Sequence, residues 1–150
     1  MVKEKKKSPG FLLLEVVLVF SLFAILCAFA FPSFARYRSS LALLGVAQNV
    51  ASTIRLARIE AIEGSVNTRI IFDVAANRLL FRGKDGKTKV YPLPAGVTLY
   101  TTNFPSHILS FYPQGTPSCG GTVTLRTSEK LRYVIVAPVT GRVRISDSPP

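Results

Sequence analysis

Two arginines near the carboxyl terminus stand two positions apart in the stretch GRVRI, Gly141 to Ile145. Residues two apart on a β-strand point to the same side and lie about 6.6 Å from each other. On a strand, Arg142 and Arg144 would therefore project together while Val143 faces the interior. Two guanidinium groups on one face suit phosphate oxygens, because each planar group can donate parallel hydrogen bonds. The spacing thus indicates a phosphate-binding pair.

Other basic residues accompany this pair. If the neighbouring strands pair as hairpins, the patch is extended by Arg126, Lys130 and Arg132. A second basic surface is the predicted hairpin of residues 82–90, which carries Arg82, Lys84, Lys87 and Lys89. From residue 36 to residue 150 the sequence has 15 basic and 6 acidic residues, a net charge of 15 − 6 = +9. This balance favours polyanions, meaning nucleic acid or anionic lipid headgroups. The alternative is that such cations only maintain solubility or protect a sheet edge.

An acidic residue of chemical interest is Glu15, which lies within an apolar run. From Phe11 to Phe31 there are 21 residues, of which only Glu15 and Ser21 are not apolar. At about 1.5 Å per residue a helix of this length spans ~31 Å, close to the ~30 Å of a bilayer core. An acidic residue costs about 2.5–3.5 kcal/mol at the centre of such a helix and less near its end. We therefore expect Glu15 to have a cationic partner.

The charges around the run predict its orientation. Lysines cluster before it, so the amino terminus is expected to stay in the cytoplasm. The alternative is a secretory signal peptide, because "AFA" at residues 28–30 resembles a small-residue cleavage site. The product would then be an exported, soluble β-domain that binds polyanions.

The elements that would position these residues follow from periodicity. Pro32 predicts a kink or a brief break, after which an amphipathic helix continues to about Gly64. Its apolar stripe follows steps of four and three and comprises Leu43, Ala47, Val50, Ile54, Ala57 and Ala61. Short strands with turn signals occupy residues 65–146, and 147–150 form a tail. We predict an α+β fold in which the helix packs on a sheet.

An enzyme is not indicated. His107 is the only histidine, no spacing suits a metal, and no nucleophile–base set is visible. Cys27 lies in the apolar run and Cys119 in a later loop, so an internal disulfide between them is not expected. The sequence predicts no cofactor.

The stretch SPGFLLLEVVLVF resembles the leader junction of type IV prepilins and type II secretion pseudopilins. In that motif the leader ends in glycine, the mature chain begins with phenylalanine, and its fifth residue is glutamate; Gly10, Phe11 and Glu15 match these three positions. Pro32 matches a proline at the twenty-second residue of the mature chain. The resemblance implies a leader of residues 1–10, cleavage between Gly10 and Phe11 by a prepilin peptidase, and methylation of the new amino group. Residues 11–31 would form the membrane and filament-core helix, and residues 32–64 its amphipathic continuation.

The cleavage implied by this resemblance supplies the partner that Glu15 needs. A new cationic amine at Phe11 of one subunit can pair with Glu15 of its neighbour, which neutralises both in an apolar setting. An unpaired buried charge is strongly disfavoured, so the pair would fix the axial register of subunits. Glu15 and Pro32 are thus predicted assembly residues.

Four later stretches, "ARIEAI" (57–62), "FYPQG" (111–115), "GTVTL" (121–125) and "GRVRI" (141–145), are together similar to the GspH/FimT group of minor pseudopilins and minor pilins. The similarity implies a long helix on a small antiparallel β-sandwich head, anchored once in the inner membrane with the head in the periplasm. Other pilins or pseudopilins would be its partners. Two functions stay open. A FimT-like pilin would capture DNA through the GRxR motif, and a secretion pseudopilin would contact secreted proteins without binding DNA.

Overall fold

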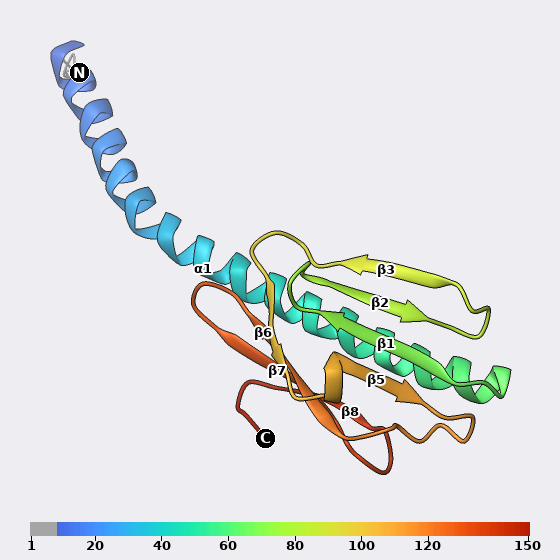
Figure 1. The fold of residues 1–150 in the computed structure, drawn as a ribbon. Helices are drawn as coiled ribbons and strands as arrows, with labels where there is room; N and C mark the ends of the chain where they lie inside the picture. The colour runs from blue at the N-terminus through green and yellow to red at the C-terminus, as the bar shows by residue number, and fades with distance from the viewer. Residues whose placement is uncertain (1–8) are drawn as a thin grey trace, which may run out of the picture. The chain divides into compact units, whose positions relative to one another are not determined.

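The computed structural model describes residues 9–150, except for the side chains of residues 9–12 and 29–36. This part of the chain begins with a long helix, α1 (Pro9–Gly64), and continues with eight strands and a 3₁₀ turn, η1 (Pro105–His107). It divides into two compact units, Met1–Arg38 and Ser39–Pro150. The second unit holds the last part of α1 and all strands, and we call it the head (Figure 1). Helix α1 runs through Pro32, so the brief break considered from the sequence is absent.

Within the head, α1 is amphipathic as predicted. All six residues of the predicted stripe are at most 2 % exposed, because this side of the helix packs against the sheets. Residues on the other side, such as Gln48, Ser52 and Arg55, are exposed. The helix ends at Gly64. The next residue, Ser65, is left-handed (φ 48°), which lets the Val66 N–H donate to the Ala61 carbonyl at 3.2 Å.

Two four-stranded antiparallel sheets make up the rest of the head (Figure 1). The first sheet has the order β3-β2-β1-β5 and the second the order β4-β6-β7-β8. The strands are β1 (Thr68–Asp73), β2 (Arg78–Arg82), β3 (Thr88–Pro92), β4 (Thr98–Thr102), β5 (Ile108–Phe111), β6 (Gly121–Arg126), β7 (Leu131–Val136) and β8 (Val143–Ser146). The α+β prediction of a long helix on an antiparallel sandwich is confirmed.

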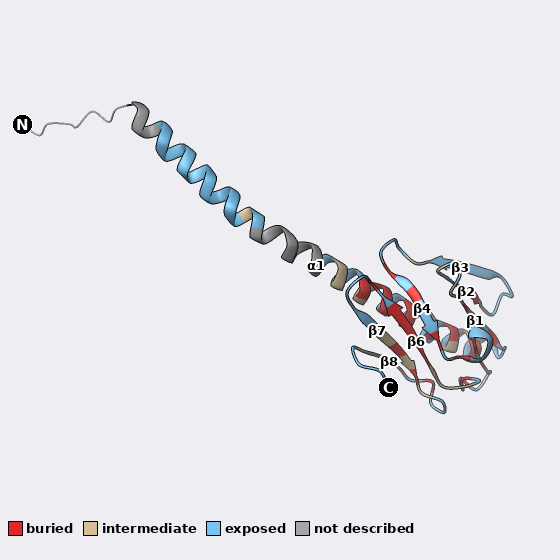
Figure 2. Ribbon diagram, turned by 60° about the vertical axis from the view of Figure 1, so that its left-hand side comes forward, coloured by how far each residue is buried: buried red, intermediate tan, exposed pale blue. Residues whose placement is uncertain are grey.

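The core lies between α1 and the inner faces of both sheets, where buried residues concentrate in Figure 2. In β6 the alternation of apolar and polar residues predicts that Val123 and Leu125 face the core and that Thr122 and Thr124 face solvent. Val123 and Leu125 are indeed fully buried, but Thr122 and Thr124 are only 8 % and 7 % exposed. Strand β6 is central in its sheet, and larger residues opposite these threonines on β7 cover them.

Candidate nucleic-acid interface

The two carboxyl-terminal arginines project from the head as the alternation predicted. Arg144 lies in β8 and Arg142 directly precedes it, and both are exposed. Val143 and Ile145, which alternate with them, are half-buried and pack against the core. Strand β8 is an edge strand of the second sheet and pairs only with β7 within the described chain. The pair of arginines therefore stands on an open edge of the head.

The turn before β8 determines where Arg142 points. Gly141 has a φ of +62°, a conformation that favours glycine. Its N–H donates to the Ala137 carbonyl at 3.1 Å, and the Ala137 N–H donates to the Arg142 carbonyl at 3.0 Å. These two bonds close the β7–β8 connection and hold the backbone of Arg142 in place.

Helix α1 brings two more arginines to the same edge. Arg55 Nη2 donates to the carbonyl of Val143 at 3.2 Å, and Arg58 Nε donates to the carbonyl of Gly115 at 3.0 Å. Each guanidinium keeps further N–H groups for a ligand. A groove of about 390 Å³ lies between the helix and the turn, lined by Arg55, Arg58, Ile59, Ile62, Gly141, Arg142 and Val143. We call it the basic groove.

Three stretches picked out from the sequence meet at the basic groove. Arg58 and Ile62 come from "ARIEAI", Gly115 from "FYPQG" and Arg142 from "GRVRI". Gly115 has a φ of +79°, and a Cβ there would lie 2.6 Å from Ile62 Cδ1. The positive φ therefore favours glycine at residue 115, and a Cβ there would displace the end of the Ile62 side chain.

Arg55 and Arg58 were not predicted as site residues. Arg58 entered the predictions only as part of the stretch "ARIEAI". Their spacing of three places them on one helix face, which was the available signal. It could not show that the β7–β8 turn lies beside that face.

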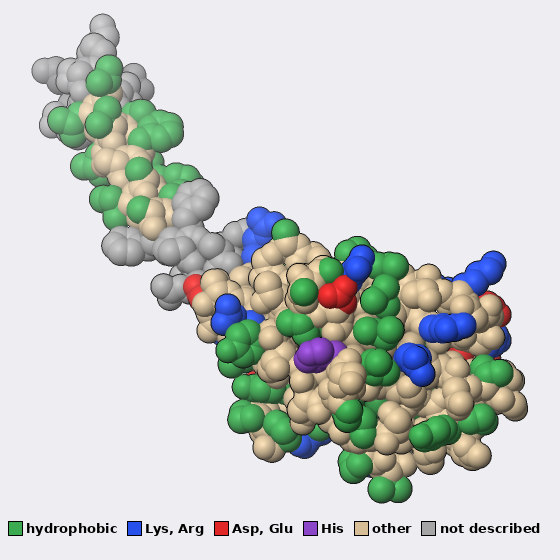
Figure 3. All heavy atoms as spheres, in the orientation of Figure 1, with side chains coloured by type: hydrophobic (Ala, Val, Ile, Leu, Met, Phe, Trp, Pro, Cys, Tyr) green, Lys and Arg blue, Asp and Glu red, His purple; other side chains and the backbone are tan. Residues whose placement is uncertain are grey.

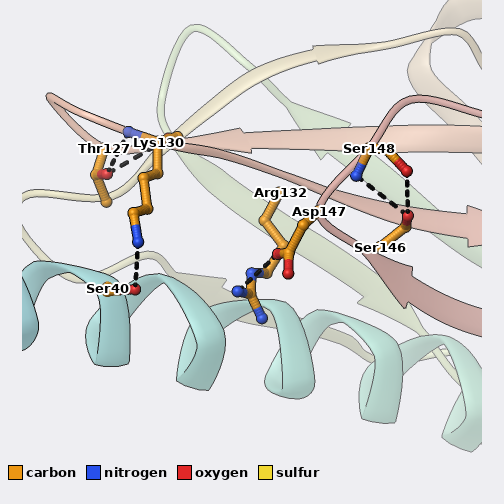
Figure 4. Close-up of polar contacts among 7 residues, drawn as sticks. All are labelled: Ser40, Thr127, Lys130, Arg132, Ser146, Asp147 and Ser148. Atoms are coloured by element: carbon orange, nitrogen blue, oxygen red, sulfur yellow. Dashed lines mark hydrogen bonds and ion pairs between the residues drawn. The ribbon is translucent and has the colours of Figure 1, made fainter.

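The remaining predicted cations do not form one patch with the pair. The Arg132 side chain is only 17 % exposed and pairs with Asp147 at 2.7 Å, turned toward α1 in Figure 4. Arg132 lies opposite the inward-facing Leu125, so it belongs to the inner side of the second sheet. Lys130 Nζ reaches Ser40 of α1 at 3.4 Å (Figure 4).

Arg126 lies on the outer side of the second sheet, the same side as Arg144. Register places Arg126 opposite Leu131 and Arg144 opposite Ile135. These β7 residues are four apart, so the two arginines are separated by about 14 Å along the strand direction. Arg126 also stacks on the ring of Tyr100, with 4.6 Å from guanidinium carbon to ring centroid. It would therefore reach a different phosphate from Arg144.

The described part of the chain contains no group of three or more histidine, cysteine or acidic residues that could hold a metal ion. His107 is exposed and has a positive φ of 57°. Cys27 and Cys119 are both free thiols.

Of the predicted processing and assembly residues, Glu15 is fully described. It lies in α1 and is exposed among exposed apolar side chains, including Leu14, Leu18 and Val19. The side chains of Gly10, Phe11 and Pro32 lie outside the described residues, as does most of the leader. Among the described residues, no helix meets the length and apolar character required to cross a membrane.

A long helix followed by a head of two antiparallel sheets is the architecture of pilin-like proteins. The family model for the type II transport protein GspH matches residues 46–141. This match covers well over half of the chain, and the chain belongs to the GspH family. Family and fold together define a structural subunit of the minor pseudopilin and minor pilin class.

Solved structures show the same fold at low sequence identity. The minor pseudopilin EpsH from the type 2 secretion system of Vibrio cholerae has a TM-score of 0.57 and 18 % identity, with 70 % of this chain and 96 % of that chain covered. The type IV minor pilin FimU of Pseudomonas aeruginosa gives 0.54 and 17 %, with 71 % and 88 % covered. A second crystal form of FimU gives 0.56 and 16 %, with 69 % and 92 % covered. No curated protein sequence matches the chain significantly.

Proposed function

We propose that this minor pilin or pseudopilin binds DNA through the open edge of its head, with Arg142 and Arg144 as the principal contacts. The observation that carries the proposal is the basic groove, where Arg55 and Arg58 of α1 lie beside Arg142. Arginines tethered to backbone carbonyls lose less conformational entropy when they bind a phosphate.

The contacts available at this edge are to the DNA backbone. Guanidinium groups at this open edge can reach phosphate oxygens, which fix position without reading sequence. Contacts to phosphates carry no sequence information, so we expect binding that is non-specific and sensitive to salt.

A mobility-shift assay with the full chain in an uncharged detergent tests the DNA proposal. Arg142→Gln/Arg144→Gln should weaken duplex binding strongly. Lys87→Gln/Lys89→Gln is the matched control, because it also removes two exposed positive charges but from the β2–β3 hairpin. Full DNA affinity in Arg142→Gln/Arg144→Gln would refute the proposal that the chain binds DNA at this edge.

We also propose that the chain is made with a leader of residues 1–10 and cut by a prepilin peptidase between Gly10 and Phe11. The new amine of Phe11, once methylated, would pair with Glu15 of a neighbouring subunit. The support is sequence similarity, together with an exposed carboxylate surrounded by exposed apolar side chains that need a cover. Before assembly, residues 11–31 would anchor the chain in the inner membrane, with the head in the periplasm.

Assembly can be tested separately from processing. Glu15→Ala should leave cleavage intact but reduce incorporation into sheared filaments, because a buried amine would then lack its counter-charge. Ser21→Ala is the control, since its hydroxyl donates to the Leu18 carbonyl of its own helix. Normal incorporation of Glu15→Ala refutes the pairing. Mass spectrometry should find methylated Phe11 as the first residue.

A second candidate function is protein export without DNA binding. It is favoured by the family description, which is that of a type II transport protein. Its partners would be other pseudopilins and secreted proteins. It predicts no measurable DNA binding at physiological salt, so the mobility-shift assay separates the two functions.

A further inference from the structure

A row of polar residues crosses three strands of the first sheet, far in sequence from the carboxyl-terminal arginines. Register places Arg69 of β1 directly opposite Arg82 of β2 on one side and Ser110 of β5 on the other. Directly opposed residues have Cβ atoms about 4.5–5.5 Å apart. The flanking Ile70 and Phe81 are fully buried, so both arginines lie on the outer face.

Figure 3 looks onto this outer face, where the first sheet lies in front of α1. Basic side chains gather on its right-hand part, over the region of the β2–β3 hairpin. A pocket of about 440 Å³ opens there. Its lining combines Arg69, Arg82 and Lys84 with the hydroxyl-bearing Ser110, Tyr112 and Ser118, and none of its lining residues is acidic.

The pairing of two arginines is electrostatically unfavourable, since like charges directly opposite on neighbouring strands destabilise a sheet. The other end of the same two strands shows the favourable arrangement, where Arg78 lies opposite Asp73 and pairs with it at 2.9 Å. Among the described residues, neither Arg69 nor Arg82 has a carboxylate within ion-pairing distance. A bound anion would remove this repulsion.

The third cation of the pocket is already compensated. Lys84 Nζ lies 3.4 Å from Glu63 Oε2, and the Lys84 backbone N–H donates to Glu60 Oε2 at 3.0 Å. These contacts fix the hairpin against the end of α1. Arg69 and Arg82 are therefore the two cations of the pocket that have no carboxylate partner among the described residues.

We propose that the row of Arg82, Arg69 and Ser110 is a binding site for a tetrahedral oxyanion, that is, a phosphate or sulfate group. Two guanidinium forks can each donate two hydrogen bonds to such a group. Ser110 and Tyr112 line the same pocket, and their hydroxyls can add further donors. A group with three or more oxygens uses all of these donors, whereas a carboxylate has only two oxygens. The pocket is larger than a bare ion, so an esterified phosphate or sulfate also fits.

Calorimetric titration of the full chain in an uncharged detergent tests the site, with inorganic phosphate, sulfate and glycerol phosphate as probes. Arg69→Gln/Arg82→Gln should weaken phosphate binding by roughly tenfold or more, since it removes every charge-assisted bond of the row. Arg78→Gln is the matched control, because it removes one charge from the same face and strands. It should change affinity by less than about twofold.

Thermal melting shows that a loss of binding is not a loss of folding. Without phosphate, Arg69→Gln/Arg82→Gln should melt no lower than the parent chain, because it relieves a like-charge pair. Phosphate should raise the melting temperature of the parent chain and not of this variant. Arg142→Gln/Arg144→Gln should keep phosphate binding, which distinguishes the site from the DNA surface.

Three outcomes overturn the proposal: phosphate binding that persists in Arg69→Gln/Arg82→Gln, an equal loss in Arg78→Gln, or no phosphate binding by the parent chain. Binding of glycerol phosphate as well as inorganic phosphate supports an esterified ligand, such as a lipid headgroup. Binding of inorganic phosphate alone supports the free ion.

Discussion

Replacing Arg142 and Arg144 by glutamine should change how DNA binding depends on salt, and the structure supplies the magnitude. Four arginines, Arg55, Arg58, Arg142 and Arg144, lie at the open edge of the head. If each neutralises one phosphate, the slope of log affinity against log salt is about −3.6, from ~0.9 per contact. The double variant keeps two contacts, and its slope should be about −1.8.

A fourfold rise in salt, from about 50 to 200 mM, then lowers affinity about 150-fold for the parent chain but only about 12-fold for the variant. Fluorescence anisotropy with a short labelled duplex measures both slopes. An unchanged slope in the variant would show that these arginines do not contact phosphates. An equal change in Lys87→Gln/Lys89→Gln would show that only the overall charge of the head matters.

Two further predictions concern the head itself. Gly115→Ala should lower stability by about 1–3 kcal/mol in thermal or denaturant melts. It should cost more than Gly86→Ala, because both glycines have positive φ (79° and 69°) but only residue 115 would overlap Ile62. Hydrogen bonds from the Ala76 N–H and then from Arg78 hold the pKa of Asp73 below its usual 3.8. That stabilisation is present above about pH 4 and is lost as pH falls through the lowered pKa. The melting temperature of Asp73→Asn should therefore fall less between neutral and acidic pH than that of the parent chain. An unchanged pH profile would contradict this.

Local patterns were sufficient to predict the elements of the head. The four-and-three spacing identified the buried stripe of α1, because a helix packed on a sheet shields one side along its length. The pair Asp85-Gly86 is typical of a hairpin turn and indicates the predicted hairpin of residues 82–90, and Gly86 indeed has a positive φ of 69°. In both cases neighbouring residues in sequence determine the outcome.

The face on which a strand residue lies was harder to predict. Arg132 was expected beside Arg142 and Arg144, and β6, β7 and β8 do pair in sequence as antiparallel neighbours. Register nevertheless places Arg132 opposite Leu125, on the inner side. A shift of one residue would have reversed this result, and the turn that sets the register leaves no clear signal in the sequence.

Contacts between distant segments could not be predicted from the sequence. Asn77 lies in the turn before β2, and its side chain accepts from the Leu99 N–H at 2.8 Å and donates to the Val97 carbonyl at 3.0 Å. One amide thus joins the first sheet to the start of β4. In the sequence an asparagine at this place indicates only a turn. Its second role, joining two segments, depends on how the two sheets pack.

The basic groove depends on α1 in a way that links the head's binding surface to its core. The side of α1 that carries Ala57 and Ala61 is buried against the sheets, while Arg55 and Arg58 on an adjacent side reach the β8 edge and the Gly115 loop. Displacement of this part of the helix would break both arginine contacts and open the core together. The groove is therefore as rigid as the packing beneath it, and its arginines need little rearrangement to meet a phosphate backbone.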